Sequence, residues 1–379
     1  MPSPAVLDFA KLLAPLPGDG PAGIDLRTDA SPESLYFAIK GARNAARAAE
    51  RQAAMADEES KPPPPDWKPV LQNSIKAIGE KSKDLEITAF LTEALVRQHG
   101  YAGLRDGFRL ARELVEKFWD VLYPRPDEDG LETRLGGLVG LNGDDAEGTL
   151  IAPIARVPIT EKTSVGQLTA ANYLEAVAVG KIADPKAKQR KIDQGTPTLD
   201  TFQKAVSETS NAFYATLVQD LAEAQQEFAK LCATLDPKCG PQAPPSSNIR
   251  SALEAALEAI NAVAKAKIDA AAAATAPKPE AAAPAAKPGA PAAGAAPAES
   301  ADVIRTREDA FKVLQKVADF FKRTEPHTVI AFTIEQVVRW GRMPLPELLA
   351  ELIPEEAARK NLFKQVGIRA EPGKPEAKK

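Results

Sequence analysis

Apolar residues recur at the spacing of an α-helix along the stretch from residue 82 to residue 124. Two such stripes are separated by the glycine-containing sequence HGYAG, and polar residues fill most positions between the apolar ones. A stripe that repeats every three or four residues marks a helix face that packs on a core. The pattern therefore predicts two antiparallel helices joined by a short turn, with the stripes Ile87, Leu91, Ala94 and Leu95, and Leu104, Phe108, Ala111, Val115 and Phe118.

The same spacing predicts three helices before this pair. The first is a short helix from Val6 to Leu13. The second is expected to begin after Ser31, as its N-cap, with Pro32 at its first position. Beyond Ile39 its sequence is polar and rich in alanine, so we expect its far half to face solvent or a partner. The third carries its apolar face at Leu71, Ile75 and Ile78.

The pattern is less regular between residues 148 and 268. Prolines at 153 and 158 and nearby β-branched residues favour one or two short extended segments, after which Thr163 or Ser164 is expected to cap a helix. Residues 197–235 read as a pair of helices or as one long helix. A further helix is predicted from Ile249 to about Ile268.

Residues 269–300 interrupt the helical pattern because they are mostly alanine, proline and glycine. Repeated prolines prevent a continuous helix, and such small side chains bury no core, so a flexible linker is predicted. A three-helix module follows it. The predicted organisation is an N-terminal helical domain at 1–150, a middle helical domain at 160–268, the linker at 269–300, a C-terminal helical module at 301–370 and a disordered tail at 371–379.

Composition supports a mainly α fold for this chain of 379 residues. Hydrophobic residues make up 44% of the chain but aromatic residues only 6%, so its cores depend on leucine, isoleucine, valine and alanine. The net charge is −4, with both signs interspersed, which argues against a nucleic-acid-binding protein. No run of apolar residues is long enough to span a bilayer, and we expect a cytoplasmic protein.

Residues suited to catalysis or metal binding are sparse. The two histidines, His99 and His327, are far apart in sequence, and His99 is expected to lie at a helix end. The two cysteines, Cys232 and Cys239, have no neighbouring ligand residues and are expected to be reduced thiols. The glycine-rich PGDGPAG lacks the lysine and hydroxyl residue of a phosphate-binding loop. We therefore expect no catalytic residue, cofactor or metal.

Three blocks of the sequence resemble a known family. They are LLAPLPGDGPAGIDLRTD at 12–29, KSKDLEITAFLTEALVRQHGYAGLRDGFRLARELVEKFWDVLYPRPDEDGLETR at 81–134, and TREDAFKVLQKVADFFKRTEPHTVIAFTIEQVVRWGRMPLPELL at 306–349. In this order they are similar to the TssA family, the ImpA-related components of bacterial type VI secretion systems. The first two resemble the ImpA N-terminal domain, and the third resembles the C-terminal module of the shorter family members.

The resemblance implies a non-enzymatic assembly protein. Members of the family contact baseplate, sheath and inner-tube proteins and prompt polymerisation of tube and sheath, while their C-terminal modules form rings. The partners expected here are therefore further copies of the chain and secretion components, without nucleic acid or membrane insertion. Two alternatives remain open at this point: a helical adaptor unrelated to secretion, and a soluble hydrolase, which the sparse chemistry makes the weaker of the two.

Two sets of residues are candidate interfaces. A charged face is predicted to contact a secretion component; it consists of Lys83, Asp84, Arg97, Arg105, Asp106 and Arg109. An oligomerisation surface is predicted on the C-terminal module; it consists of Phe321, Glu325, His327, Arg339 and Trp340.

Overall fold

The computed structural model describes residues 2–18, 20–31, 33–56, 63–128, 130–144, 146–275, 307–324 and 329–352. The fold is mainly α, as predicted. Within these ranges β-structure is limited to isolated bridges, and no β-strand is formed. Two compact units divide the chain, Met1–Glu280 and Ala281–Lys379. The first contains helices α1 Phe9–Leu12, η1 Leu26–Thr28, α2 Leu35–Met55, α3 Lys68–Glu80, α4 Leu85–Phe118, α5 Glu132–Asn142, α6 Ile151–Ala155, α7 Ala170–Gly180, α8 Pro185–Asp193, α9 Leu199–Glu208, α10 Asn211–Cys239, η3 Gly240–Gln242 and α11 Ser247–Thr275.

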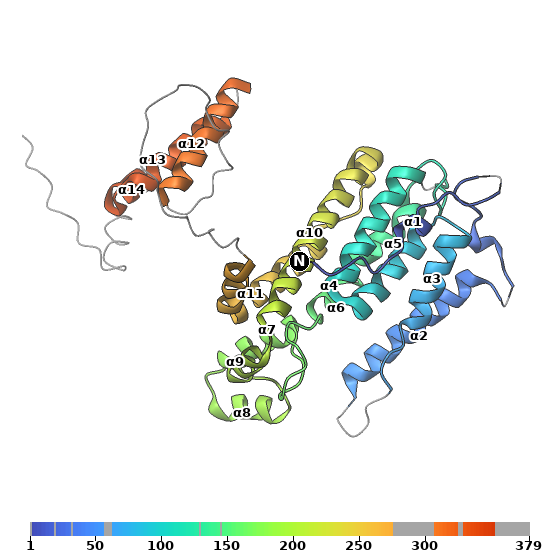
Figure 1. Ribbon diagram of the computed structural model, residues 1–379, viewed down its shortest axis with the longest axis horizontal. Helices are drawn as coiled ribbons and strands as arrows, with labels where there is room; N and C mark the ends of the chain where they lie inside the picture. The colour runs from blue at the N-terminus through green and yellow to red at the C-terminus, as the bar shows by residue number, and fades with distance from the viewer. Residues whose placement is uncertain are drawn as a thin grey trace, which may run out of the picture. The chain divides into compact units, whose positions relative to one another are not determined.

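Helix α4 is the centre of the first unit. It packs against α10 on one side and against α3 on another, and α2 lies beyond α3 (Figure 1). The buried hydrophobic side chains form one continuous cluster from Leu7 to Ala264. Residues of the predicted N-terminal and middle domains thus share a core within one compact unit, and a finer boundary between them stays a prediction.

The two predicted antiparallel helices are the two arms of α4. Gly100 interrupts the helix with φ 56° and ψ −138°, a conformation that glycine adopts without the strain a Cβ would bring. Beyond it the chain turns back, so that a Cβ on Gly103 would lie 2.3 Å from the carbonyl oxygen of Leu95. The backbone of Asp84, which precedes the first arm, also forms a β-bridge with that of Tyr123, which follows the second arm. The prediction of a helical hairpin is confirmed.

Several predicted helix starts are displaced. Ser34, not Ser31, is the N-cap of α2, because Ser31 takes part in a preceding turn in which the Asp29 carboxylate accepts its N–H. Helix α7 is capped by Thr169, whereas Thr163 pairs with Gly166 in a turn. The extended segments expected around prolines 153 and 158 are not formed, since Pro153 lies in α6 and Pro158 makes only an isolated bridge with Thr169.

The structure has helices at the other positions where the sequence predicts them, although their bounds differ. Residues 197–235 form a pair, α9 and α10, and α8 was not predicted. Helix α11 runs to Thr275, which is within the predicted linker, and the rest of that linker lies outside the described residues. The second unit contains the three predicted helices α12 Arg307–Thr324, α13 Val329–Arg342 and α14 Leu345–Leu352. The predicted tail also lies outside the described residues.

Candidate interaction surfaces

The predicted charged face begins with Lys83, but this side chain is fully buried. Its Nζ donates hydrogen bonds to the carbonyl oxygens of Leu12 at 2.7 Å and Ile78 at 2.9 Å. These carbonyls belong to the last turns of α1 and α3. Carbonyl groups in the last turn of a helix have no N–H partner within that helix. Burial lowers the pKa of Lys83 to about 8. Lys83 therefore joins two helix ends and is not available to a partner.

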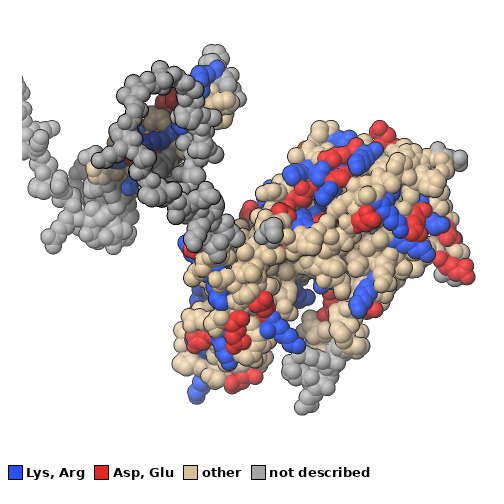
Figure 2. All heavy atoms as spheres, viewed as in Figure 1, with Lys and Arg blue, Asp and Glu red and all other residues tan. Residues whose placement is uncertain are grey.

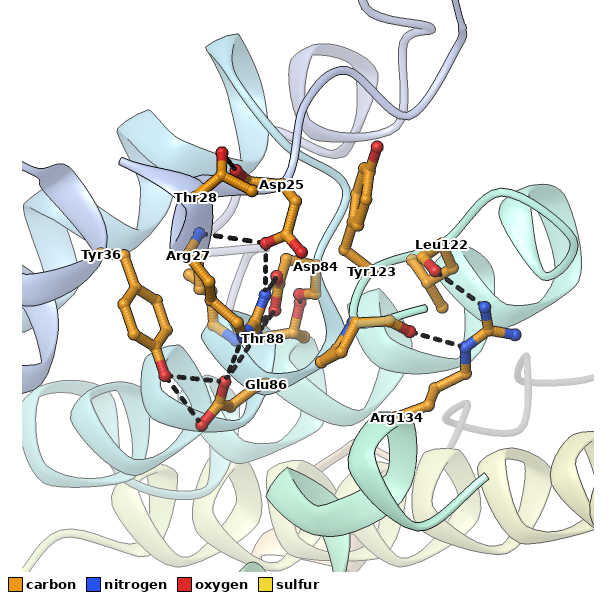
Figure 3. A network of polar contacts seen from close by, with 12 residues as sticks. Asp25, Arg27, Thr28, Tyr36, Asp84, Glu86, Thr88, Leu122, Tyr123 and Arg134 are labelled. Atoms are coloured by element: carbon orange, nitrogen blue, oxygen red, sulfur yellow. Dashed lines mark hydrogen bonds and ion pairs between the residues drawn. The ribbon is translucent and has the colours of Figure 1, made fainter. Parts of the chain in front are cut away.

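Asp84 is buried as well and lies in a polar network at the start of α4 (Figure 3). Its carboxylate accepts the N–H of Ile87 at 2.9 Å, which caps the helix, and two hydrogen bonds from the Arg27 guanidinium at 2.6 and 3.2 Å. Arg27 also donates to Glu86, whose carboxylate accepts the Tyr36 hydroxyl at 3.2 Å. Burial opposes the charge on Arg27, but hydrogen bonding and attraction to Asp84 outweigh it and raise its pKa.

The glycine-rich loop before η1 is fixed to the same place by its backbone. Ile24 N donates to the carbonyl oxygen of Lys81 at 3.1 Å, and Lys83 N donates to that of Ala22 at 2.8 Å. On the other side, Tyr123 N donates to the Lys83 carbonyl at 2.9 Å. The first two sequence blocks thus meet at one site, and their charged residues there hold the N-terminal loop against the α4 hairpin.

Arg105 and Asp106 form a second buried network. Asp106 accepts the Val6 N–H at 2.6 Å and pairs with Arg105 at 2.8 Å. Arg105 also donates to the carbonyl oxygen of Ser3 at 2.9 Å and to Glu223 on α10 at 3.1 Å. These contacts join the N-terminal segment to α4 and α10.

The prediction of an exposed face is therefore wrong for four of its six residues: Lys83, Asp84, Arg105 and Asp106. All four are buried, and polar partners on neighbouring segments offset the cost of burying their charges. Reversing the charges of Arg105 and Asp106 would break contacts inside the fold, so that pair is unsuited to probing a docking surface. Whether the other two residues, Arg97 and Arg109, contact a partner stays a prediction.

Arg109 lies in a groove between α4 and α10 with a volume of about 510 Å³. The charges of this groove are paired with one another: Arg109 with Glu113 at 2.7 Å, and Glu227 with both Arg112 at 3.0 Å and Lys230 at 2.8 Å. Figure 2 shows blue and red side chains interleaved where α10 and α4 lie. Because cations and anions neutralise each other here, the groove has no evident preference for a ligand of one sign.

Arg97 lies on the opposite side of α4, beside α2. Its guanidinium donates to both carboxylate oxygens of Glu50, at 2.5 and 2.9 Å, and stacks over the Trp67 ring at 3.9 Å from its centroid. The indole N–H of Trp67 donates to Glu50 at 2.8 Å. The far half of α2, which the sequence predicted to face solvent or a partner, thus contacts α4 through its polar side chains.

The C-terminal candidates differ in their exposure. Arg339 is exposed and pairs with Glu351, Phe321 is half-buried beside Phe320, and Trp340 is half-buried with its indole nitrogen enclosed and unpaired within the described chain. Glu325 and His327 lie outside the described residues. Other apolar side chains nearby are more exposed than Phe321 and Trp340: Val317, Phe320, Val329, Phe332, Val337 and Leu352. Hydrophobic periodicity marks such residues as core, so the sequence alone did not indicate them.

The described part of the chain was expected to lack metal ligands and to keep its histidine and cysteines apart. No group of three or more histidine, cysteine, aspartate or glutamate side chains there is arranged to hold a metal ion. His99 is exposed at the end of the first arm of α4, where it was expected. Cys232 and Cys239 are free thiols, and burial raises the pKa of both. None of the described helices is both long and apolar enough to cross a membrane.

Comparison with known proteins gives three matches. Residues 13–143 match the family model described as ImpA, N-terminal, type VI secretion system. The chain is 27% identical over 368 residues to the type VI secretion system component TssA1 of Pseudomonas aeruginosa strain PAO1, covering 92% of this chain and 96% of that protein.

The third match is a solved structure. It is the N-terminal domain, including the conserved ImpA_N region, of the TssA component of the type VI secretion system from Burkholderia cenocepacia. The TM-score is 0.58 at 24% sequence identity, and the match covers 71% of this chain and 98% of that domain. At this identity the likeness supports the fold. Its extent shows that helices beyond residue 143 belong to the shared architecture.

Proposed function

We propose that this chain, which matches the ImpA N-terminal family model of the type VI secretion system over residues 13–143 and is similar to TssA1, is a structural assembly component of that system. In this proposal it has no catalytic activity, acts in the cytoplasm, helps to assemble the baseplate and primes polymerisation of tube and sheath. Its multivalency comes from self-association into a ring. The division of labour is that the C-terminal module self-associates while the N-terminal unit engages secretion components.

One observation carries the self-association: α12 and α13 expose several large apolar side chains and bury few of their described residues. Val329 is 75% exposed, Phe332 62% and Val337 43%, whereas the described residues that are buried in these helices are Ala318, Ala331 and Val338. Ala331 and Val338 lie one heptad apart and so share one face of α13, and the exposed residues point away from it. A face of this kind is typical of an interaction surface.

The size of the module supports the same reading. Units below about 80 residues bury little apolar area and often gain stability from oligomerisation. Burying the exposed residues would contribute to the free energy of association, because fully burying a valine or phenylalanine side chain yields about 1.5–3 kcal/mol. A second copy of the module is the simplest partner able to cover a repeated apolar face.

The predicted linker would let self-association of the C-terminal modules produce multivalent binding by the N-terminal units. If several C-terminal modules associate, the alanine- and proline-rich residues between the two units tether an equal number of N-terminal units at one place. Tethered binding sites act at a high effective concentration, so weak individual contacts add up to tight binding when the linker spans the sites. This suits a component that gathers many subunits of a growing polymer.

Mass photometry of the full chain tests the proposal. The wild type is expected to form discrete oligomers, and the double substitution Val329→Ser with Phe332→Ser is expected to shift it to monomers, because two exposed apolar contacts per chain are lost. Leu174→Ser is the matched control, since Leu174 is 53% exposed on α7 in the other unit. A wild type that is strictly monomeric at micromolar concentration would contradict the proposal, as would oligomers unchanged in the double variant.

A further inference from the structure

A groove lined by arginines lies between α2, α4 and α6 in the first unit. Its volume is about 230 Å³, and four guanidinium groups contribute to its walls: Arg47, Arg51, Arg97 and Arg156. The two carboxylates in the same walls belong to Glu50 and Glu147. The groove therefore has more cations than anions, unlike the groove between α4 and α10.

The hydrogen bonds and ion pairs of these groups increase the excess of unpaired positive charge in the groove. Glu50 already accepts two hydrogen bonds from Arg97 and one from Trp67, so its charge is neutralised inside the wall. Within the described part of the chain, no hydrogen bond or ion pair joins the side chains of Arg47, Arg51 or Arg156 to a carboxylate. In the groove wall these three cations share one further carboxylate, that of Glu147, which is exposed.

Arg47 has no hydrogen-bonded anion among the described residues. It is half-buried on α2, and its nearest charges include the cations Arg43, Arg51 and Arg97. Burial is the largest influence and lowers the pKa of Arg47. Attraction from Glu93, which raises the pKa, comes second, and repulsion from these cations lowers it further. One oxygen of the Glu93 carboxylate accepts hydrogen bonds from Arg43 and Thr149, and the other is buried without a hydrogen-bond partner among the described residues. A desolvated cation without a hydrogen-bonded anion is unfavourable, and a bound carboxylate would remove the cost.

We propose that this groove binds an acidic segment of a protein partner, with glutamate or aspartate side chains held by Arg47, Arg51 and Arg156. The planar guanidinium fork matches a carboxylate in a bidentate arrangement. The rest of the wall is made by small or apolar residues, Ala54, Gly148, Ala152 and Pro153, against which a peptide backbone can lie. The volume is below the roughly 300–1,000 Å³ of small-molecule sites, which favours an anchoring side chain over a metabolite.

A nucleic acid fits this groove less well than an acidic peptide. A phosphate backbone is negative along its whole length, whereas Glu50 and Glu147 interrupt the row of arginines. The chain as a whole is also acidic, at −4. The inference deepens the proposed function by naming the chemistry of the partner, but its test requires neither self-association nor a secretion protein, so either proposal is able to fail alone.

Fluorescence anisotropy with the full chain tests the groove. The probe is a fluorescein-labelled peptide of alternating glutamate and alanine, and the matched peptide has glutamine in place of glutamate. Binding of the first and not the second is expected, and it is expected to weaken as salt is added. The combined substitution Arg47→Gln with Arg156→Gln is expected to reduce the affinity about tenfold to a hundredfold, the loss of charge-assisted hydrogen bonds.

The control is Arg190→Gln with Arg250→Gln, which removes the same charge from exposed positions on α8 and α11. It is expected to leave the affinity unchanged. Equal losses in both variants would overturn the proposal, since they would show non-specific attraction, as would equal binding of the two peptides. Tighter binding of oligothymidylate than of the glutamate peptide would also overturn it. Arg47→Gln is expected to maintain or raise the melting temperature, which separates lost binding from lost folding.

Discussion

At the scale of single residues, Lys83 shows how a charge serves the fold. Its ammonium group is buried among backbone carbonyls at the ends of α1 and α3, with no carboxylate beside it in the described structure. Hydrogen bonds to helix C-terminal carbonyls favour the cation, while burial disfavours it. Burial prevails in this balance, and the pKa of Lys83 falls to about 8.

This lowered pKa gives the stability a defined pH dependence. The folded chain releases the Lys83 proton near pH 8, whereas the unfolded chain retains it to the usual lysine value of 10.5. Unfolding between these values takes up a proton, so the free energy of unfolding rises with pH. We expect wild type to gain about 1 kcal/mol relative to Lys83→Met between about pH 7 and pH 9 in urea unfolding. Equal pH dependence in the two chains would contradict this account of Lys83.

The buried networks also show what sequence reasoning misses at this scale. Arg27 and Asp84 are 57 positions apart, and Arg105 and Asp220 are 115 apart. A charged residue between apolar ones reads as the solvent side of a helix unless its distant partner is known. Lys83, Asp84, Arg105 and Asp106 were therefore predicted as a surface, while Arg27 and Glu86, which complete one of their networks, were not singled out.

At the scale of elements, the α4 hairpin was predictable because its signals are local. Apolar stripes on both arms and glycines at the turn lie within one stretch of sequence, so no distant partner had to be known. The start of α2 was not, because the turn that includes Asp29 and Ser31 precedes the true N-cap, Ser34. The arginine groove was missed for a related reason, since α2, α4 and α6 meet only in the folded chain.

Gly103 tests the close packing of the two arms. A Cβ there would lie 2.3 Å from the Leu95 carbonyl oxygen, and this backbone atom does not move aside without separating the arms. Gly103→Ala is expected to lower the free energy of unfolding by about 1–3 kcal/mol, the usual cost of overpacking.

The matched control for this change is Gly41→Ala, in the exposed interior of α2, where nothing lies within 4 Å of an added Cβ. It is expected to raise the free energy of unfolding by about 0.5–1 kcal/mol, because alanine is the better helix former. Urea titrations measure both. Similar effects of the two substitutions would show that the arms of α4 do not approach as closely as described.

At the scale of the whole molecule, exposed large apolar side chains are concentrated in the second unit. In the first, one hydrophobic core joins helices from α1 to α11, and its ion pairs largely satisfy one another outside the arginine groove. In the second, six large apolar residues are exposed on the three described helices, compared with five in the whole described part of the first unit. This contrast supports the proposed division between a self-contained binding unit and a self-associating module, with the predicted linker between them in sequence.

The proposal's central claim is that the chain works as a multivalent component of the secretion machine. Affinity purification of the tagged chain from cells that express its own secretion cluster, followed by mass spectrometry, tests this most directly. We expect sheath, inner-tube and baseplate proteins to be enriched with wild type, and enriched less with Val329→Ser/Phe332→Ser, since loss of self-association removes avidity. Recovery of none of these proteins above an untagged control would contradict the account.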